Sequence, residues 1–165
     1  MLTLADKNIT MWLLPSGVED IDAPKVSEIS AGSNISQKVF KQDTYLRPTA
    51  SEAVSEPLLS GDPAQGYGQD NFEGQLNVGR FYDTDGKPDA TLDTLWTAAK
   101  AKGTPLTIAM RYGAHWNTAP VSGQEVSVYE VTTDNPQPPQ DLSGFIKRII
   151  PLAVMKASLD VALAS

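Results

Sequence analysis

The stretch that decides the fold runs from Phe72 to Tyr112 and reads FEGQLNVGRFYDTDGKPDATLDTLWTAAKAKGTPLTIAMRY. In its first part, Phe72–Asp83, apolar and polar residues alternate at period two, which is the pattern of a half-buried strand. The apolar face of this expected strand consists of Phe72, Leu76, Val78 and Tyr82. An Asp-Gly turn follows, and the same alternation returns from Leu106 to Tyr112, where we expect a second strand.

The segment between these two strands predicts an amphipathic helix over Leu92–Lys102. Its apolar residues recur at i, i+3, i+4 and i+7 and form one stripe: Leu92, Leu95, Trp96 and Ala99. Gly103 supplies the left-handed residue that commonly ends a helix, and Pro105 follows it. Because so short a helix is unstable alone in water, we expect the stripe to dock on a sheet as a small core.

The rest of the chain predicts further strands separated by long polar connections. Strands are expected at Ile9–Leu14, Val39–Leu46, Glu52–Leu59, Gln124–Thr132 and the first half of Phe145–Leu163. Pro151 restricts the last of these to a sheet edge, a kink or a bulge, and from Met155 onward the residues would also suit a helix. Val26–Ala31 predicts one helical turn before Gly32, whereas residues 61–71 carry turn residues without apolar periodicity.

These elements together predict a mainly β fold for one domain over residues 1–165. We expect an antiparallel β-sandwich or partly closed barrel, with one flanking α-helix and long loops or arms. The chain has no cysteine, which excludes a disulfide framework and fits assembly in a reducing cytoplasm. No apolar run approaches the ~18 residues of a membrane span, and no secretion signal is recognisable.

The charge and motif content argue against catalysis and against tight nucleic-acid binding. The net charge is −7, from 20 acidic and 13 basic residues, and the pair Lys147 and Arg148 is too small for a phosphate-binding patch. The single histidine, His115, lies in a loop, and no nucleophile motif or phosphate-binding loop accompanies it. We therefore expect no enzyme and no catalytic, cofactor-binding or metal site.

The acidic run from Asp83 to Asp89 was compared with a calcium-binding loop. An EF-hand needs glycine at its sixth position and glutamate at its twelfth, whereas here Gly86 is fourth and Thr94 is twelfth. The run therefore favours an Asp-Gly turn that leads into an Asp-capped helix.

A series of short runs follows one order along the chain, from Met11 to Ala164. They are ISAGSNISQKVF, SEAVSEPLLSG, DNFEGQLNVGRFYDTDGKPD, a helix ending in AKGTP, RYG, and EVSVYEVTTDNPQPPQDLSGFIKRIIPLAV. This order resembles the major tail proteins, or tail tube proteins, of bacteriophages with long non-contractile tails, those of actinobacterial phages in particular.

The resemblance implies a structural virion protein with two packed β-sheets and a flanking helix, which would correspond to Leu92–Lys102. It implies self-assembly into stacked hexameric rings that form the tail tube, a conduit for DNA that is not bound sequence-specifically. Expected partners are further copies of the chain and the tape measure, terminator and distal tail proteins, with no membrane. The expected location is the virion tail, and the host cytoplasm during assembly. The N-terminal segment and loops 15–36 and 47–71 are the expected assembly arms.

Two observations on the residues agree with such a role. Strands that are apolar on both faces, at Gln124–Thr132 and Phe145–Leu163, exceed the needs of one small core, and a sheet shared between subunits would use the surplus. An acidic lumen would repel phosphate and leave no site where DNA sticks. The polar face of the first strand supplies the expected lumen-lining residues: Glu73, Gln75, Asn77 and Asp83.

Two alternatives remain at this point. One is another ring component of the virion, such as a tail terminator or a head-decoration protein, which would form a single closed ring that does not polymerise. The other is a ligand-binding or calcium-binding β-sandwich module, for which calcium binding lost in Asp85→Asn would be the evidence.

Overall fold

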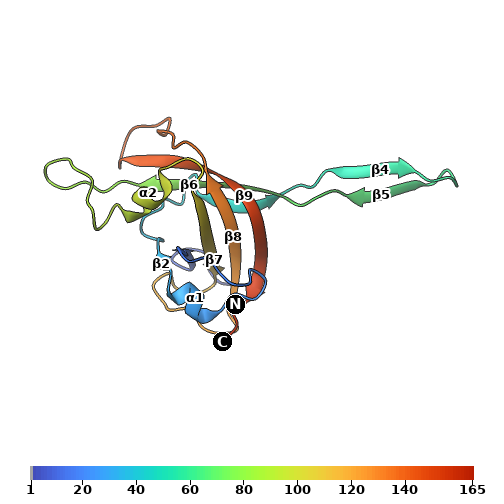
Figure 1. Cartoon of the computed structure of the whole chain (residues 1–165), viewed down its shortest axis with the longest axis horizontal. Helices are drawn as coiled ribbons and strands as arrows, with labels where there is room; N and C mark the ends of the chain where they lie inside the picture. Colours follow the sequence, from blue (N-terminus) through green and yellow to red (C-terminus); the bar gives the residue numbers. More distant parts are fainter. Residues whose placement is uncertain (1) are drawn as a thin grey trace.

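The centre of the molecule is one antiparallel sheet of seven strands, seen in a computed structural model that describes residues 2–165 (Figure 1). Its strands are β1 (Ile9–Leu13), β2 (Ser33–Asn34), β3 (Tyr45–Thr49), β6 (Asn71–Gly79), β7 (Pro105–Tyr112), β8 (Glu125–Thr133) and β9 (Lys147–Ala162). They lie in the order β2-β1-β7-β8-β9-β6-β3. Two short helices flank the sheet, α1 (Val26–Ser30) and α2 (Thr94–Ala99). The expected mainly β, antiparallel fold class is confirmed.

The sheet is curled, so that its two ends share one core. Met11 of β1 and Leu46 of β3, which lie near opposite ends of the strand order, both belong to the main buried cluster. The hydroxyl of Tyr129 on β8 donates a hydrogen bond to the Leu46 carbonyl oxygen, 3.1 Å away, although β9 and β6 lie between their strands. The chain after β2 then bridges the gap, because Ile35 N–H donates to the Met11 oxygen and Phe40 N–H to the Asn77 oxygen.

Two cores lie on opposite faces of the sheet. The main core lies inside the curl and includes Tyr129 and Val131 of β8. The second core packs the other face of β1, β7 and β8 against the α1 segment, and it includes Val126 and Val128 of β8 together with Ile29 of α1. Both apolar faces of β8 are therefore buried within one subunit. Our interpretation of β8 as surplus surface for a shared sheet was wrong, because the α1 segment covers it.

The last strand, β9, is a single strand of 16 residues that lies between β8 and β6 in the middle of the sheet. The segment from Met155 onward is strand and not helix. Pro151 lies in the middle of the sheet and not at its edge, in a continuous strand whose pairing with β8 is irregular. The Pro151 carbonyl oxygen accepts a hydrogen bond from Asp134, one residue past the end of β8. In a strand, the backbone N–H and C=O of one residue point toward the same neighbouring strand. The N–H that Pro151 lacks would therefore face β8, at the point where the hydrogen bonds between β8 and β9 end, so little pairing is lost. Two register irregularities interrupt the β8–β9 pairing farther along.

The flanking helix α2 is shorter than the expected 92–102. Leu95 and Ala99 are fully buried in the main core and Trp96 packs against it, so three of the four stripe residues dock. Leu92 lies in the turn over residues 90–93, before the helix begins, and its side chain remains 48% exposed. Gly103 has the expected left-handed backbone, with φ of +81°.

Three other boundaries differ from the sequence predictions. The strand expected at Val39–Leu46 begins only at Tyr45, and Val39 forms one isolated bridge to Val78. The strand expected at 72–83 ends at Gly79. Residues 61–71 are not only turn, because they contain β5 (Pro63–Tyr67), which pairs with β4 (Ala53–Pro57).

Candidate assembly surface

The hairpin of β4 and β5 projects away from the sheet as a long arm (Figure 1). Its strands continue from β3 and β6, whose last paired residues are Thr49 and Asn71. Every residue of β4 and β5 is exposed, and residues 53–67 contribute nothing to either core. We call residues 50–70 the arm.

The arm lacks the packing that normally stabilises strands. A two-stranded hairpin is marginally stable in water unless a third strand or a helix covers one of its faces. The arm nevertheless carries apolar side chains in the open, namely Val54, Leu58, Leu59 and Tyr67. An exposed paired hairpin with an apolar tip is typical of a segment that is covered by a partner.

A groove of about 520 Å³ opens where the curled sheet fails to close, between β1 and β7 on one side and β3 on the other. Its floor is the main core, reached at Met11, Leu46 and Met110. Aromatic side chains line its walls, namely Phe40, Tyr45, Tyr112 and Trp116. Sequence reasoning missed this groove, because its residues come from four separate segments that only the curvature of the sheet brings together.

The charged residues that line the groove are all basic: Lys7, Lys41 and Arg47. Lys41 is paired with Asp6, and hydrogen bonding from Lys41 lowers the pKa of that carboxyl below its usual value. Arg47 is paired with Glu73 on the neighbouring strand at 2.5 Å. Within residues 2–165, Lys7 has no carboxylate within 4 Å of its ammonium nitrogen.

One wall of the groove is held by a buried arginine. The Arg111 guanidinium, 1% exposed, donates to the carbonyl oxygens of His115, Thr118 and Ala119, and it stacks on Trp12 at 4.9 Å from the ring centroid. Its other acceptors are the side-chain oxygens of Thr10, Thr118 and Gln124. None of these acceptors is a carboxylate, and burial lowers the pKa of the guanidinium. Arg111 therefore fixes the loop over residues 113–123, which carries the groove residue Trp116.

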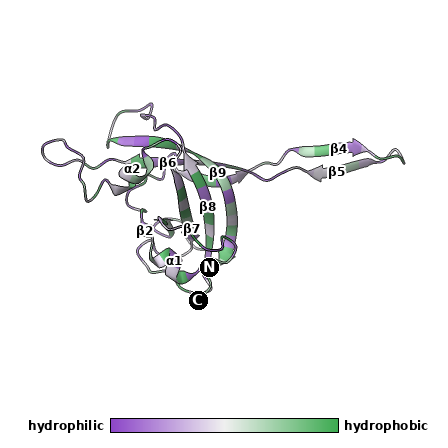
Figure 2. Cartoon of the chain, viewed as in Figure 1, coloured by the Kyte–Doolittle hydropathy of each residue, from purple (hydrophilic) through white to green (hydrophobic). Residues whose placement is uncertain are grey.

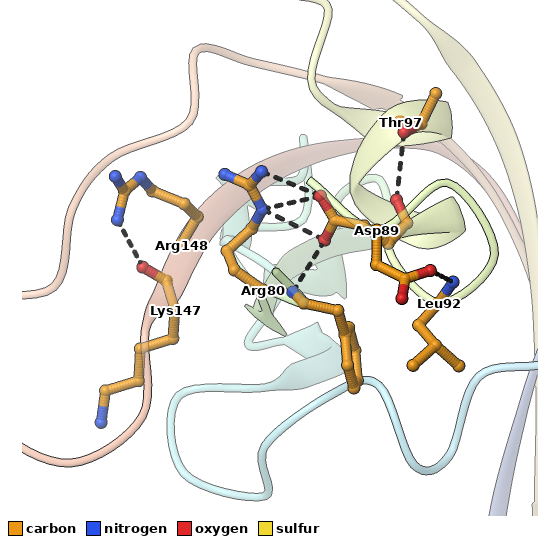
Figure 3. A network of polar contacts seen from close by, with 8 residues as sticks. Arg80, Asp89, Leu92, Thr97, Lys147 and Arg148 are labelled. Carbon is orange, nitrogen blue, oxygen red and sulfur yellow. Dashed lines mark hydrogen bonds and ion pairs between the residues drawn. The ribbon is translucent and has the colours of Figure 1, made fainter. Parts of the chain in front are cut away.

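At the opposite end from the arm, a polar network anchors α2 to the end of β6 (Figure 3). Two nitrogens of Arg80 donate to the Asp93 carboxylate at 2.8–3.2 Å, and Phe81 N–H donates to the same carboxylate. The Arg80 guanidinium also lies over the Trp96 ring, 4.3 Å from its centroid. Thr97 Oγ1 closes the network by donating to the Asp93 carbonyl oxygen. The helix is thus positioned by an ion pair that apolar periodicity does not reveal.

The structure does not bring the four expected lumen residues together. Glu73 and Gln75 lie on one face of β6, where Glu73 pairs with Arg47 and Gln75 donates to the Asp43 oxygen. Asn77 is buried inside the subunit, where its side-chain amide donates a hydrogen bond to the Gln42 carbonyl oxygen. Asp83 lies beyond the strand, in a turn where it accepts from the N–H groups of Asp85 and Lys87.

The remaining sequence candidates are engaged locally. Asp89 Oδ1 accepts from the N–H groups of Thr91 and Leu92 in the turn before α2. The predicted Asp-capped helix is not found, because the N-cap residue of α2 is Asp93 and its side chain makes no capping hydrogen bond. His115 Nδ1 lies 2.6 Å from the Asn117 side-chain oxygen. Lys147 lies over the Phe40 ring, and Arg148 Nη1 donates to the Lys147 oxygen (Figure 3).

The comparison with known families decides how the arm and the curled sheet are to be understood. The family model described as phage tail tube protein matches residues 1–165. The chain belongs to this family. The resemblance seen in the sequence runs is confirmed at the level of the tail tube protein, while the actinobacterial type remains a prediction. No curated protein sequence matches the chain.

As a tail tube protein, the chain is a structural component of the virion tail. No helix within residues 2–165 is long and apolar enough to cross a membrane. The arm and the groove are the two parts of this subunit in which apolar side chains are left in the open.

Proposed function

We propose that this tail tube protein assembles into stacked hexameric rings, and that the stack forms the conduit through which DNA leaves the virion. The observation that carries the proposal is the arm, because a fully exposed hairpin with an apolar tip gains stability only from a second molecule. In a tail tube protein, the most abundant such molecule is another copy of the chain.

The length of the arm suits contacts beyond the nearest edge of a neighbour. Leu59 is ten positions after Thr49 in the chain, and at about 3.3 Å per position the extended segment spans roughly 33 Å. A compact body of the size of the remaining chain has a diameter of roughly 35–40 Å. The loop 15–36 is a weaker candidate for an arm, because Ile21, Ile29 and Ile35 within it are buried in the subunit's own cores.

For the lumen, we propose the face of β6 that carries Glu73 and Gln75. On the neighbouring strands, this face continues with Arg47 of β3 on one side and with Pro151 and Ala153 of β9 on the other. Because Arg47 is paired with Glu73, the face is polar but has no cluster of unpaired basic side chains. Such a surface gives DNA phosphates few sites for attachment. The tape measure, terminator and distal tail proteins are the further partners that this role requires.

Electron microscopy of the purified chain across a concentration series tests the proposal. The unmodified chain should form rings or tubes, and end-on views should show their symmetry. A variant in which residues 52–69 are replaced by a short turn should melt at the same temperature, because the arm lies outside both cores, and should stay monomeric. A strictly monomeric unmodified chain, even with tail partners present, would contradict the proposal, and a single ring that never stacks would favour a terminator.

A further inference from the structure

We propose that the groove between β1, β7 and β3 is the receptor for the arm of a second copy, with the Val54, Glu56 and Leu58 face of the hairpin seated in it. This inference rests on the proposed function and deepens it, because it names the two surfaces that join. The arm runs away from its own sheet, so the occupant of the groove comes from another molecule (Figure 1).

The two surfaces are complementary in charge. Residues 50–70 contain four carboxylates, those of Glu52, Glu56, Asp62 and Asp70, and no basic residue. No ammonium or guanidinium within residues 2–165 pairs with any of the four. The charged residues that line the groove are the cations Lys7, Lys41 and Arg47; Lys41 and Arg47 are already paired with Asp6 and Glu73, so Lys7 supplies the uncompensated positive charge within residues 2–165. Opposite potentials favour this pairing and disfavour contact between two arms.

The register of the hairpin gives its two faces different characters. Val54 and Glu56 lie on the same face, and their partners across the hairpin are the small residues Gly66 and Ala64. Leu58 continues this face at period two, so the face carries an apolar, an acidic and an apolar side chain in succession. The neighbouring strand adds only the small residues Gly66 and Ala64 beside them. Tyr67 belongs to the other face, opposite Ala53.

That face matches the groove in shape and polarity. Leu58, 53% exposed, and Val54 would lose water-exposed surface by packing over the groove floor, where Met11 and Met110 are already buried, and against the half-exposed wall residue Tyr112. Gly66 and Ala64 leave room for large aromatic walls such as Trp116. Glu56, between the two apolar anchors, would face Lys7, the groove cation that has no ion-pair partner within residues 2–165. Figure 2 shows hydrophobic and hydrophilic residues close together along the arm.

Disulfide trapping tests the pairing directly, because the chain contains no native cysteine. Leu58→Cys is combined with Tyr112→Cys, which lies in the groove wall and is half exposed. A matched control combines Leu58→Cys with Asp85→Cys, an equally open position in the turn at the other end of the molecule. A disulfide requires Cα atoms within about 7 Å. Assembled material should give a covalent ladder on a non-reducing gel for the groove pair, with none for the control pair.

A charge exchange supplies the second arm of the test. Lys7→Glu or Glu56→Lys alone should raise the critical concentration for assembly about tenfold, and the two together should restore it, as expected for a close charge pair across an interface. Melting of each variant before assembly verifies that the fold is intact; if Lys7→Glu does not fold, Lys41→Glu replaces it.

The outcomes separate this inference from the proposed function. Tubes that form normally while neither the groove pair cross-links nor the charge exchange rescues would overturn the receptor assignment and leave the tube role standing. Equal cross-linking in the control pair, or an intramolecular disulfide in dilute monomer, would also overturn it. If the unmodified chain forms neither rings nor tubes, the tube role fails, and the receptor assignment fails with it.

Discussion

Arg80 and Asp93 form an ion pair inside the molecule, with Arg80 Nη2 2.8 Å from Asp93 Oδ2 and side chains that are 7% and 1% exposed. The pair joins the end of β6 to the start of α2, and the ring of Trp96 covers the guanidinium. Breaking a buried pair leaves one uncompensated charge, which costs more than replacing both partners by apolar groups.

Asp93→Ala should therefore lower the free energy of unfolding by about 3–5 kcal/mol. The double variant Arg80→Leu with Asp93→Ala should lose less than the sum of the single variants Arg80→Leu and Asp93→Ala, since it leaves neither charge buried without its partner. Urea unfolding of the monomer measures all four proteins. Additive losses would show that the pair is not coupled in the folded state.

Arg111→Met should release the loop over residues 113–123. Methionine fills much of the same volume but leaves the carbonyl oxygens of His115, Thr118 and Ala119 without their donor. We expect a loss of about 2–4 kcal/mol and faster amide hydrogen exchange in the loop. Arg111→Lys is the matched control, because lysine keeps the positive charge but has fewer hydrogen-bond donors. Its stability should lie between that of the unmodified chain and that of Arg111→Met. Unchanged exchange in the methionine variant would contradict the anchoring role.

Alkaline pH should destabilise the fold through Tyr129. Burial raises the pKa of its hydroxyl from 10 to about 12, so the unfolded chain loses this proton first as the pH rises. The stabilising contribution is present below pH 10 and is lost between pH 10 and about 12, by roughly 2–3 kcal/mol. Urea unfolding from pH 8 to 11.5 should show a steeper decline in the unmodified chain than in Tyr129→Phe. Parallel curves would exclude Tyr129 as the group responsible.

Gly32→Ala should destabilise the junction between α1 and β2. A Cβ atom at Gly32 would lie 2.3 Å from Leu14 Cδ2 and 2.9 Å from the Leu13 carbonyl oxygen, and the backbone oxygen cannot move aside. We expect a loss of about 1–3 kcal/mol. Gly66→Ala in the arm is the control, because nothing lies within 4 Å of the corresponding Cβ position. Its melting temperature should stay unchanged.

Glu73→Lys tests the lumen assignment. It removes the acidic partner of Arg47 and leaves two adjacent cations on the β6 face, where they would retain passing phosphates. Phage carrying this change should form tails of normal length but eject DNA more slowly, as followed by fluorescence of released DNA. The exchange of Arg47→Glu with Glu73→Arg keeps the pair neutral and should eject normally. Normal ejection by Glu73→Lys would remove the assignment.

The sequence predicts well those elements that bury one face. Leu76 and Val78 of β6, and Leu95 and Ala99 of α2, lie in the main core because alternation and helical periodicity report burial directly. The strand β5 buries neither face and so has no alternation of apolar and polar residues. Its sequence therefore predicts a loop. Arg111 falls on the polar parity of β7, and it is a buried residue because the loop over residues 113–123 folds over it and supplies hydrogen-bond acceptors.

The groove could not be predicted, for a different reason. Lys7 lies far in the sequence from Lys41 and Arg47, and the three line one groove because the sheet curls until β3 approaches β1. Curvature depends on the twist of every strand together, which no local pattern encodes. The lumen candidates failed to gather because β6 ends at Gly79 and the segment before β3 covers Asn77.

The central place of β9 has a consequence for the order of events during synthesis. The half of the sheet formed by β6 and β3 joins β8 only through β9, which is translated last among the strands. A nascent chain therefore displays its arm on the ribosome well before the groove exists. If the groove receives the arm, a nascent chain would offer no receptor to the arm of its neighbour until β9 is in place.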